Sequence, residues 1–126
     1  MNREAASLVL IVDDDPDVLS SVCAVLESAG YRTVTAANGR EGIALLDARP
    51  DLVLTDMNME DSSGLELINA IRFSGASTPV IAMSGWIPAG YDPLAVALKL
   101  GATQVLRKDK MDQLLPMVAQ VLGAHT

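Results

Sequence analysis

Five short apolar runs, separated by stretches with helical spacing, constrain this chain more than any other feature of its sequence. The runs cover residues 8–12, 31–36, 52–55, 80–83 and 104–107. The first run has no polar alternation, which is typical of a strand covered on both faces. Strands that alternate with helices need crossover connections, and these favour a mainly parallel sheet between two layers of helices. The predicted fold class is therefore α/β: a doubly wound five-stranded parallel sheet flanked by five helices.

The ends of the first helix can be read from the sequence. Asp15 followed by Pro16 is typical of an N-cap and a first helical residue, and Gly30 supplies a left-handed stop. The buried stripe of this helix is expected to consist of Val18, Leu19, Val22, Val25 and Leu26.

The other helices are predicted from similar signals. Asn38 with Glu41 three residues later is a capping pattern for a second helix that runs through about Ala48. Asp92 and Pro93 begin a short helix that ends at Gly101. Two further helices are expected over residues 64–74 and roughly 111–122.

The charge and the aromatic content argue against nucleic acid as a direct partner. Nine Lys and Arg residues stand against 16 Asp and Glu residues, which gives a formal charge of −7. A surface of that sign repels a phosphate backbone. The chain also has too few aromatic residues to build a platform for stacked bases. They are Tyr31, Phe73, Trp86 and Tyr91.

Neither a membrane anchor nor a disulfide is predicted. The longest apolar stretches run for about five residues, far short of the ~20 that a spanning helix needs. Residues 1–7 are polar, unlike a secretory signal. A single cysteine, Cys23, excludes an internal disulfide. The length fits one domain over residues 1–126, and we expect it in the cytoplasm, with no membrane partner.

Polar side chains follow four of the five predicted strands. Asp13 and Asp14 come after the first strand, Asp56 after the third, Ser84 after the fourth and Lys108 after the fifth. Ligands of open parallel sheets bind outside the carboxyl ends of the strands, near the point where the strand order reverses. We therefore expect these five side chains to form one site.

The chemistry of this predicted site suits a phosphoryl group. Three clustered carboxylates repel one another, and a hard divalent cation such as Mg²⁺ relieves that repulsion. Lys108 adds a positive charge and Ser84 adds a hydroxyl donor. An acidic metal site, a lysine and a hydroxyl together can bind a dianionic phosphoryl group.

The same motifs resemble the receiver domain of two-component response regulators. They are Leu-Ile-Val-Asp-Asp at 10–14, Leu-Thr-Asp-Met-Asn-Met at 54–59 followed by Gly64-Leu65, Met83-Ser84, and Lys108. The resemblance extends from Leu8 to about Leu122 and keeps the order and approximate spacing of every motif. It implies a flavodoxin-like sheet with strand order 2-1-3-4-5, and a stand-alone receiver without an output domain.

The resemblance also implies a role for each site residue. Asp56 corresponds to the aspartate that accepts the phosphoryl group. Asp13, Asp14, Asp56 and the backbone carbonyl of Asn58 correspond to the ligands of Mg²⁺, for which Mn²⁺ can substitute. Ser84 and Lys108 correspond to the groups that contact the phosphoryl oxygens.

The implied partners are proteins. A sensor histidine kinase or a histidine phosphotransfer protein would supply the phosphoryl group, and a downstream protein target would receive the signal. Output would pass through the face formed by residues 93–100, the fifth strand and the last helix. The chain would be a signalling domain rather than an enzyme, and a monomer or a weak phosphorylation-dependent dimer.

Two positions close to Lys108 depart from the family pattern, and a third residue offers a replacement for what one of them lacks. Asp109 follows Lys108 where the family usually has proline, so a trans bond is expected there, and Asp109 is expected to compete with phosphate for the lysine. Val105 stands where an aromatic switch residue is common. Trp86, two residues after Ser84, is expected to overhang the site and either to replace that aromatic as the moving part or to shield the phosphate.

Two other functions use the same residues. A degenerate receiver would keep the fold and bind partners without phosphorylation. A haloacid-dehalogenase-like phosphatase would use Asp13 as nucleophile and Asp15 as general acid, but it would leave Asp56 unexplained and normally needs a longer chain. The modified residue separates a receiver from a phosphatase: Asp56 in the first, Asp13 in the second.

Overall fold

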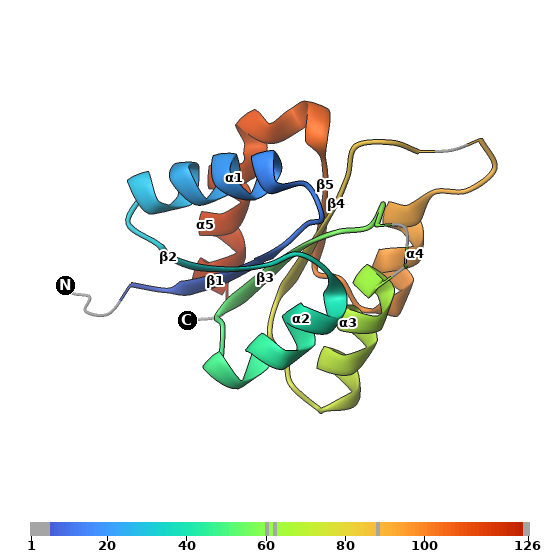
Figure 1. Ribbon diagram of the computed structural model, residues 1–126, viewed down its shortest axis with the longest axis horizontal. Coiled ribbons are helices and arrows are strands. Elements are labelled where there is room, and N and C mark those ends of the chain that lie inside the picture. Colours follow the sequence, from blue (N-terminus) through green and yellow to red (C-terminus); the bar gives the residue numbers. More distant parts are fainter. Residues whose placement is uncertain (1–5, 60, 62, 88, 125–126) are drawn as a thin grey trace.

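Five parallel strands form the centre of the molecule (Figure 1). The computed structural model describes residues 6–59, 61, 63–87 and 89–124. The strands pair in the order β2-β1-β3-β4-β5, which confirms the predicted topology. Their bounds are β1 (Leu8–Val12), β2 (Arg32–Ala36), β3 (Leu52–Asp56), β4 (Val80–Ser84) and β5 (Gln104–Arg107).

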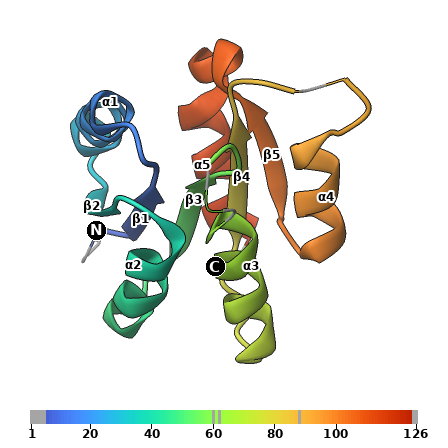
Figure 2. The same cartoon turned by 45° about the vertical axis from the view of Figure 1, so that its right-hand side comes forward.

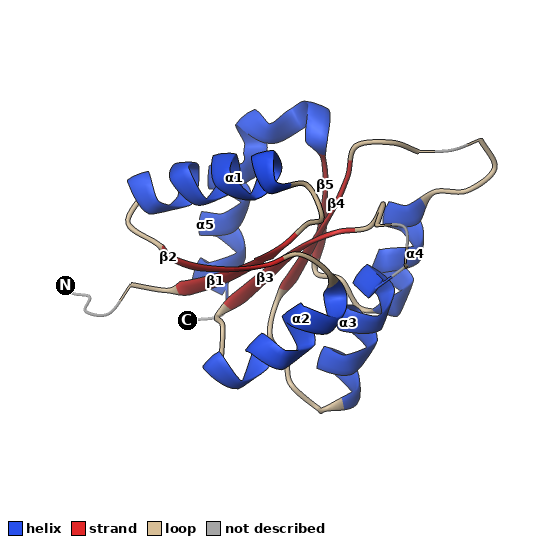
Figure 3. Ribbon diagram, viewed as in Figure 1, coloured by secondary structure: helices blue, strands red, loops and turns tan. Residues whose placement is uncertain are grey.

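Helices cover both faces of this sheet (Figures 2 and 3). One face is covered by α1 and α5, and the other by α2, α3 and α4. Two 3-10 segments, η1 and η2, lie between α2 and β3 and between β5 and α5. The bounds are α1 (Pro16–Ser28), α2 (Gly39–Ala44), η1 (Leu45–Ala48), α3 (Ser63–Phe73), α4 (Pro93–Leu100), η2 (Lys108–Gln113) and α5 (Leu114–Ala124).

The alternation of side chains along each strand divides the core in two. In β1, Val9 and Ile11 pack with α1 and α5, whereas Leu10 and Val12 pack with α3 and its neighbours. Because successive strand residues point to opposite faces, a strand covered on both sides must be apolar throughout. This explains why β1, β3 and β4 read as continuous apolar runs.

The predicted helix caps are confirmed. Asp15 accepts a hydrogen bond from the backbone N–H of Asp17 at 2.9 Å and caps α1. Asn38 accepts one from the N–H of Glu41 at 2.9 Å and caps α2. Gly30, just past the end of α1, has a φ of 96°, the left-handed conformation that glycine adopts without a steric penalty.

Three helix predictions need correction. The second helix ends at Ala44, and residues 45–48 tighten into the 3-10 segment η1. The last helix begins at Leu114 rather than near 111, because residues 108–113 form 3-10 turns with a non-helical backbone at Lys110. Val25, predicted to be buried in α1, is 41% exposed because it lies at the edge of the stripe.

The connections between the strands determine which edge of the sheet can bind a ligand. From β1 the chain crosses to β2 on one side, and β3 then lies on the other side of β1. The strand order therefore reverses between β1 and β3, and their carboxyl ends flank the crevice where open α/β sheets bind ligands. Within the part of the chain that the structure describes, no helix combines the length and the apolar character needed to cross a membrane.

Candidate functional site

Three carboxylates converge at the carboxyl edge of the sheet. Asp13 follows β1 directly and Asp56 ends β3, and the residues before them, Val12 and Thr55, are paired in the sheet. Asp13, Asp14 and Asp56 each offer a carboxylate oxygen, and these oxygens lie within 4.8 Å of one another. The side chains of Asp13 and Asp56 are buried, whereas Asp14 is exposed. Such a cluster of like charges opposes folding unless positive charge balances it.

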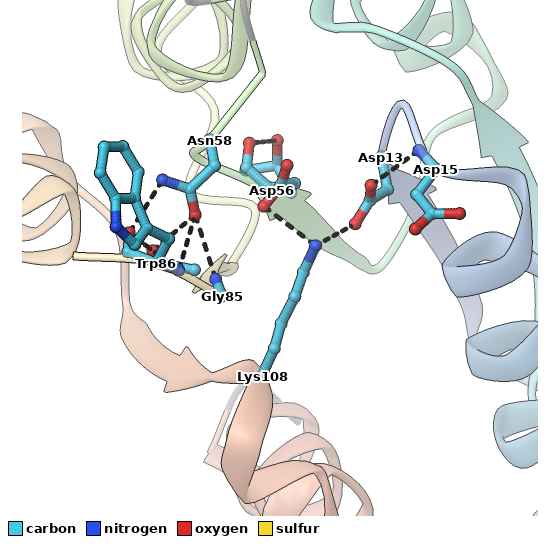
Figure 4. A network of polar contacts seen from close by, with 9 residues as sticks. Asp13, Asp15, Asp56, Asn58, Gly85, Trp86 and Lys108 are labelled. Atoms are coloured by element: carbon cyan, nitrogen blue, oxygen red, sulfur yellow. Dashed lines mark hydrogen bonds and ion pairs between the residues drawn. The ribbon is translucent and has the colours of Figure 1, made fainter. Parts of the chain in front are cut away.

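Lys108 supplies positive charge to this cluster (Figure 4). Its Nζ lies 2.7 Å from Oδ2 of Asp13 and 3.1 Å from Oδ1 of Asp56. The other oxygen of Asp13 accepts a hydrogen bond from the N–H of Asp15 at 3.0 Å, so both oxygens of Asp13 have partners. Asp56 Oδ1 is buried and accepts no well-directed hydrogen bond from the described residues, so its contact with Lys108 is an ion pair.

The pKa values in the cluster reflect burial and mutual charge. Burial and the charge of Asp13 raise the pKa of Asp56, and Lys108 only partly offsets them. Burial and the charge of Asp13 also raise the pKa of Asp14. Burial lowers the pKa of Lys108, but its hydrogen bond with Asp13 and the charge of Asp56 outweigh that effect, so the pKa is raised overall. The cluster thus holds more negative charge than one lysine balances.

The residues present fit a divalent cation. Three carboxylate oxygens meet within one ion's reach, and one of them belongs to the exposed side chain of Asp14, where solvent can complete the coordination. Mg²⁺ prefers one or two carboxylates together with retained waters. The buried Asp56 oxygen without a hydrogen-bond donor is a further observation in favour of an additional positive partner.

Ser84 lies at the end of β4 and is linked to Asn58. The residue is buried at 2% exposure, and its hydroxyl lies 2.6 Å from Asn58 Oδ1 and 2.8 Å from the carbonyl oxygen of Trp86. Asn58 also binds the backbone of Gly85 and Trp86, so its side chain joins the loop after β3 to the loop after β4 (Figure 4). Sequence reasoning pointed only to the backbone carbonyl of Asn58, because no local pattern marks this side chain.

The absence of proline after Lys108 does not turn the lysine away from the acids. The Lys108–Asp109 bond is trans, as predicted. Lys108 still reaches Asp13 and Asp56, and Gly85 lies against its aliphatic stem, since a Cβ at Gly85 would be 3.3 Å from Lys108 Cδ. The expected competition from Asp109 is not found in this structure, because the Asp109 carboxylate pairs with Arg107 at 3.1 Å.

Ser84, Trp86 and Val105 are the three candidate switch residues, and the last two lie in different surroundings. Val105 in β5 is half-buried and packs against the core layer that includes α4. Trp86 is 67% exposed, and its hydrogen bonds with Asn58 and Ser84 are made by its backbone. In Figure 4 its indole lies beyond Asn58, on the side away from Lys108. The indole therefore does not overhang the carboxylates in this state.

Comparison with known proteins identifies the family. A sequence model of the response regulator receiver domain matches residues 9–119. The chain therefore belongs to the receiver domain family of two-component systems. Members are signalling modules rather than typical enzymes; they interact with histidine kinases or phosphotransfer proteins and bind Mg²⁺ at an acidic pocket. The predicted family and fold are both confirmed.

Individual solved structures and relatives are similar to this chain at moderate sequence identity. The chemotaxis protein CheY4 of Vibrio cholerae has a TM-score of 0.82 at 30% identity, covering 93% of this chain and 99% of that one. A receiver protein from Burkholderia phymatum has a TM-score of 0.78 at 35% identity, covering 93% and 95%. The cell cycle response regulator CtrA of Brucella ovis is 33% identical over 101 residues. That match covers 79% of this chain but only 43% of the CtrA protein, so the chain spans less than half the length of this curated relative.

Proposed function

We propose that this chain is a phospho-accepting receiver in a two-component or phosphorelay pathway, with Asp56 as the acceptor. The observation that carries the proposal is the convergence of Asp56 with Asp13, Asp14 and Lys108 at the carboxyl edge of the sheet. The carboxylate of Asp56 lies beside the ammonium group of Lys108, whose charge favours the ionised form that a nucleophile needs.

The proposed reaction moves a phosphoryl group from nitrogen to oxygen. A carboxylate oxygen of Asp56 attacks the phosphorus of a phosphohistidine, an O–P bond forms and the P–N bond breaks, and its electron pair stays on the imidazole. Asp56 must be ionised to attack. The ammonium group of Lys108 contacts the Asp56 carboxylate and would contact the phosphoryl oxygens after transfer. The hydroxyl of Ser84, at the same edge of the sheet, would donate a hydrogen bond to a phosphoryl oxygen.

The proposed cofactor is Mg²⁺ or Mn²⁺. Asp13, Asp14, Asp56 and the backbone carbonyl of Asn58 would hold it. When bound, the ion would neutralise negative charge on the carboxylates and on the incoming phosphoryl group. Asp13 is already oriented by Asp15 and Lys108, so it needs little rearrangement to serve as a ligand.

The proposed partners are a sensor histidine kinase or phosphotransfer protein and a downstream protein target, all in the cytoplasm. The proposed output face comprises α4, β5 and α5, and over α4 and β5 a groove of about 490 Å³ combines apolar and basic side chains. Ile87 and Leu98 are exposed along it, and Arg107 and Lys110 supply positive charge. We further propose that the chain is a monomer or a weak dimer that forms on phosphorylation, and that it does not bind nucleic acid.

A labelling experiment tests the acceptor. The protein is incubated with acetyl phosphate or phosphoramidate, with Mg²⁺ or with EDTA, and its intact mass is measured. One phosphoryl group is expected with Mg²⁺ and none with EDTA. Peptide mapping after borohydride trapping is expected to find the label on Asp56.

Matched variants make the result specific. Asp56→Asn is expected to abolish labelling, whereas Asp47→Asn, a change at an aspartate in η1 far from the cluster in sequence, is expected to leave it intact. A label on Asp13 would instead support phosphatase-type chemistry, and no label with either donor would support a receiver that acts by binding alone. Asp15, the general acid that a phosphatase would need, is occupied in capping α1.

A further inference from the structure

The side chain of Asn58 forms a bridge between two loops of the site. Its Oδ1 accepts hydrogen bonds from the hydroxyl of Ser84 at 2.6 Å and from the N–H of Gly85 at 3.0 Å. Its Nδ2 donates to the carbonyl oxygen of Trp86 at 3.0 Å. One short side chain that follows β3 thus binds three consecutive residues at the end of β4 and just after it (Figure 4).

The backbone groups fix the orientation of this amide. The N–H of Gly85 can only donate, so the atom that faces it must be the amide oxygen of Asn58. The carbonyl of Trp86 can only accept, so the atom that faces it must be the amide nitrogen. Binding both backbone groups requires a side chain of the length of asparagine that carries one acceptor and one donor. Aspartate lacks the donor, and leucine lacks both.

The bridge occupies the hydroxyl that the phosphoryl group would need. Ser84 is 2% exposed and has a single hydroxyl hydrogen, which points to Asn58 or to the Trp86 carbonyl. While that hydrogen is held there, it is not available to a phosphoryl oxygen on Asp56.

We infer that the side chain of Asn58 is a latch, which holds Ser84 and the backbone of residues 85–86 in the resting position until a phosphoryl group on Asp56 competes for the hydroxyl. This inference rests on the proposed function. It makes Asn58 a positioning residue, distinct from the role of its backbone carbonyl as a metal ligand. On this proposal the hydrogen bonds of Asn58 break when Ser84 turns to the phosphoryl group, so the latch favours the resting state.

Removing the Asn58 side chain is expected to raise the affinity for a phosphoryl analogue, whereas truncating a residue that supports the site would lower it. Asn58→Ala keeps the backbone carbonyl, and the Ser84 hydroxyl keeps the Trp86 carbonyl as a partner. The resting state alone loses hydrogen bonds, so a phosphoryl analogue is expected to bind more tightly. One net hydrogen bond corresponds to an increase in affinity of about twofold to tenfold. A residue that merely supports the site would instead give weaker binding when truncated.

Trp86 provides the readout. It is the single tryptophan of the chain. Its backbone is bound by the latch and the residue is 67% exposed, so release of the loop changes the surroundings of the fluorophore. Beryllofluoride with Mg²⁺ serves as the analogue, because it binds a carboxylate as a tetrahedral group of phosphoryl shape.

The experiment titrates beryllofluoride into the full chain and follows Trp86 fluorescence. The variants are the wild type, Asn58→Ala and the control Asn69→Ala, which removes an exposed asparagine of α3. In Asn58→Ala, the half-saturating concentration is expected to fall by about twofold to tenfold, and the spectrum without ligand is expected to shift toward that of the saturated wild type. Asn69→Ala is expected to match the wild type.

A second measurement needs no variant. In the wild type, exchange of the Gly85 amide hydrogen is expected to accelerate when beryllofluoride binds, because its acceptor on Asn58 is released. Equal or weaker binding by Asn58→Ala, or a Gly85 amide that stays equally protected, overturns the latch. If the wild type itself fails to bind beryllofluoride, the proposed function fails, and the latch falls with it. The two failures are therefore distinguishable.

Discussion

At Asp56, burial and the neighbouring charge of Asp13 hold the pKa of the carboxyl above its ordinary value of 3.8. Below pH 3.8 the group is protonated in both the folded and the unfolded chain, so its titration does not lower the free energy of unfolding. As the pH rises from 3.8 toward the raised pKa, the unfolded chain releases the proton first, so the free energy of unfolding falls. Above the raised pKa the penalty is complete.

Asp56→Asn is therefore expected to stabilise the metal-free protein at pH 7 and to lose that advantage in acid. The measurement is thermal unfolding in EDTA as a function of pH, with Asp47→Asn as the control outside the cluster. For a chain of this length, each 1 kcal/mol gained at the transition raises Tm by about 3–5 °C. A variant less stable than the wild type in EDTA at pH 7 would show that the carboxylates are not crowded.

The charge of Lys108, unlike that of Asp56, is expected to stabilise the folded protein. Its side chain is 22% exposed and pairs with two buried carboxylates. Lys108→Met is expected to lower the free energy of unfolding in EDTA by about 2–3 kcal/mol, because it leaves Asp13 buried without its ion pair. Mg²⁺ is expected to restore part of the loss by supplying positive charge.

The pH dependence of this effect follows from the raised pKa of Lys108. The stabilisation is fully present below the ordinary pKa of 10.5 and is lost as the pH rises through the higher folded value. The gap between wild type and Lys108→Met is therefore expected to be constant at neutral pH and to narrow above 10.5 in urea titrations. Lys110→Met, a change at an exposed lysine two residues away, is the control, and an equal loss there would refute the ion-pair account.

Among the elements, the contact between α2 and α3 depends on a glycine. The N–H of Gly39 donates to Ser63 Oγ at 2.7 Å, and a Cβ at Gly39 would lie 1.9 Å from the backbone oxygen of Ser63. Gly39→Ala is therefore expected to cost about 3 kcal/mol, because backbone must shift to relieve the clash. Chemical denaturation measures it. Gly123→Ala, where a Cβ would meet nothing within 4 Å, is expected to leave stability equal or slightly higher.

The elements and the acidic site could be predicted because their signals are local or follow from topology. Apolar runs define strands that are covered on both faces, and the carboxyl ends of parallel strands bring Asp13 and Asp56 together. The hydrogen-bond and ion-pair partners of individual loop side chains could not be predicted. Three cations lie within two residues of Asp109, and its carboxylate pairs with Arg107. The side chain of Asn58 turns toward the end of β4. Both choices depend on where the loops lie in space.

Arg72 shows how packing beyond an element's own sequence determines its position. It lies in the last turn of α3 and donates hydrogen bonds to the carbonyl oxygens of Thr78 at 2.7 Å and of Gly101 at 2.8 Å. These bonds join α3, the loop before β4 and the end of α4. Nothing in the spacing of the sequence marks Arg72 as such a link, since a basic residue in the last turn of a helix is also typical of a simple charge–dipole contact.

For the whole molecule, whose net charge is −7, Mg²⁺ can raise stability in two ways: by screening the repulsion between like charges and by binding at a specific site. Screening acts on all exposed charges and depends on ionic strength alone. Specific binding adds RT ln(1 + [Mg²⁺]/Kd), about 2.7 kcal/mol at roughly one hundred times Kd. Melting curves in Mg²⁺ and in NaCl at matched ionic strength separate the two. The wild type is expected to gain more from Mg²⁺, and Asp13→Asn is expected to respond equally to both salts, because it removes a carboxylate that is buried within the cluster. Asp47→Asn is expected to keep the wild-type difference. If Asp13→Asn keeps it too, the ion binds elsewhere, and the cluster is balanced by Lys108 alone.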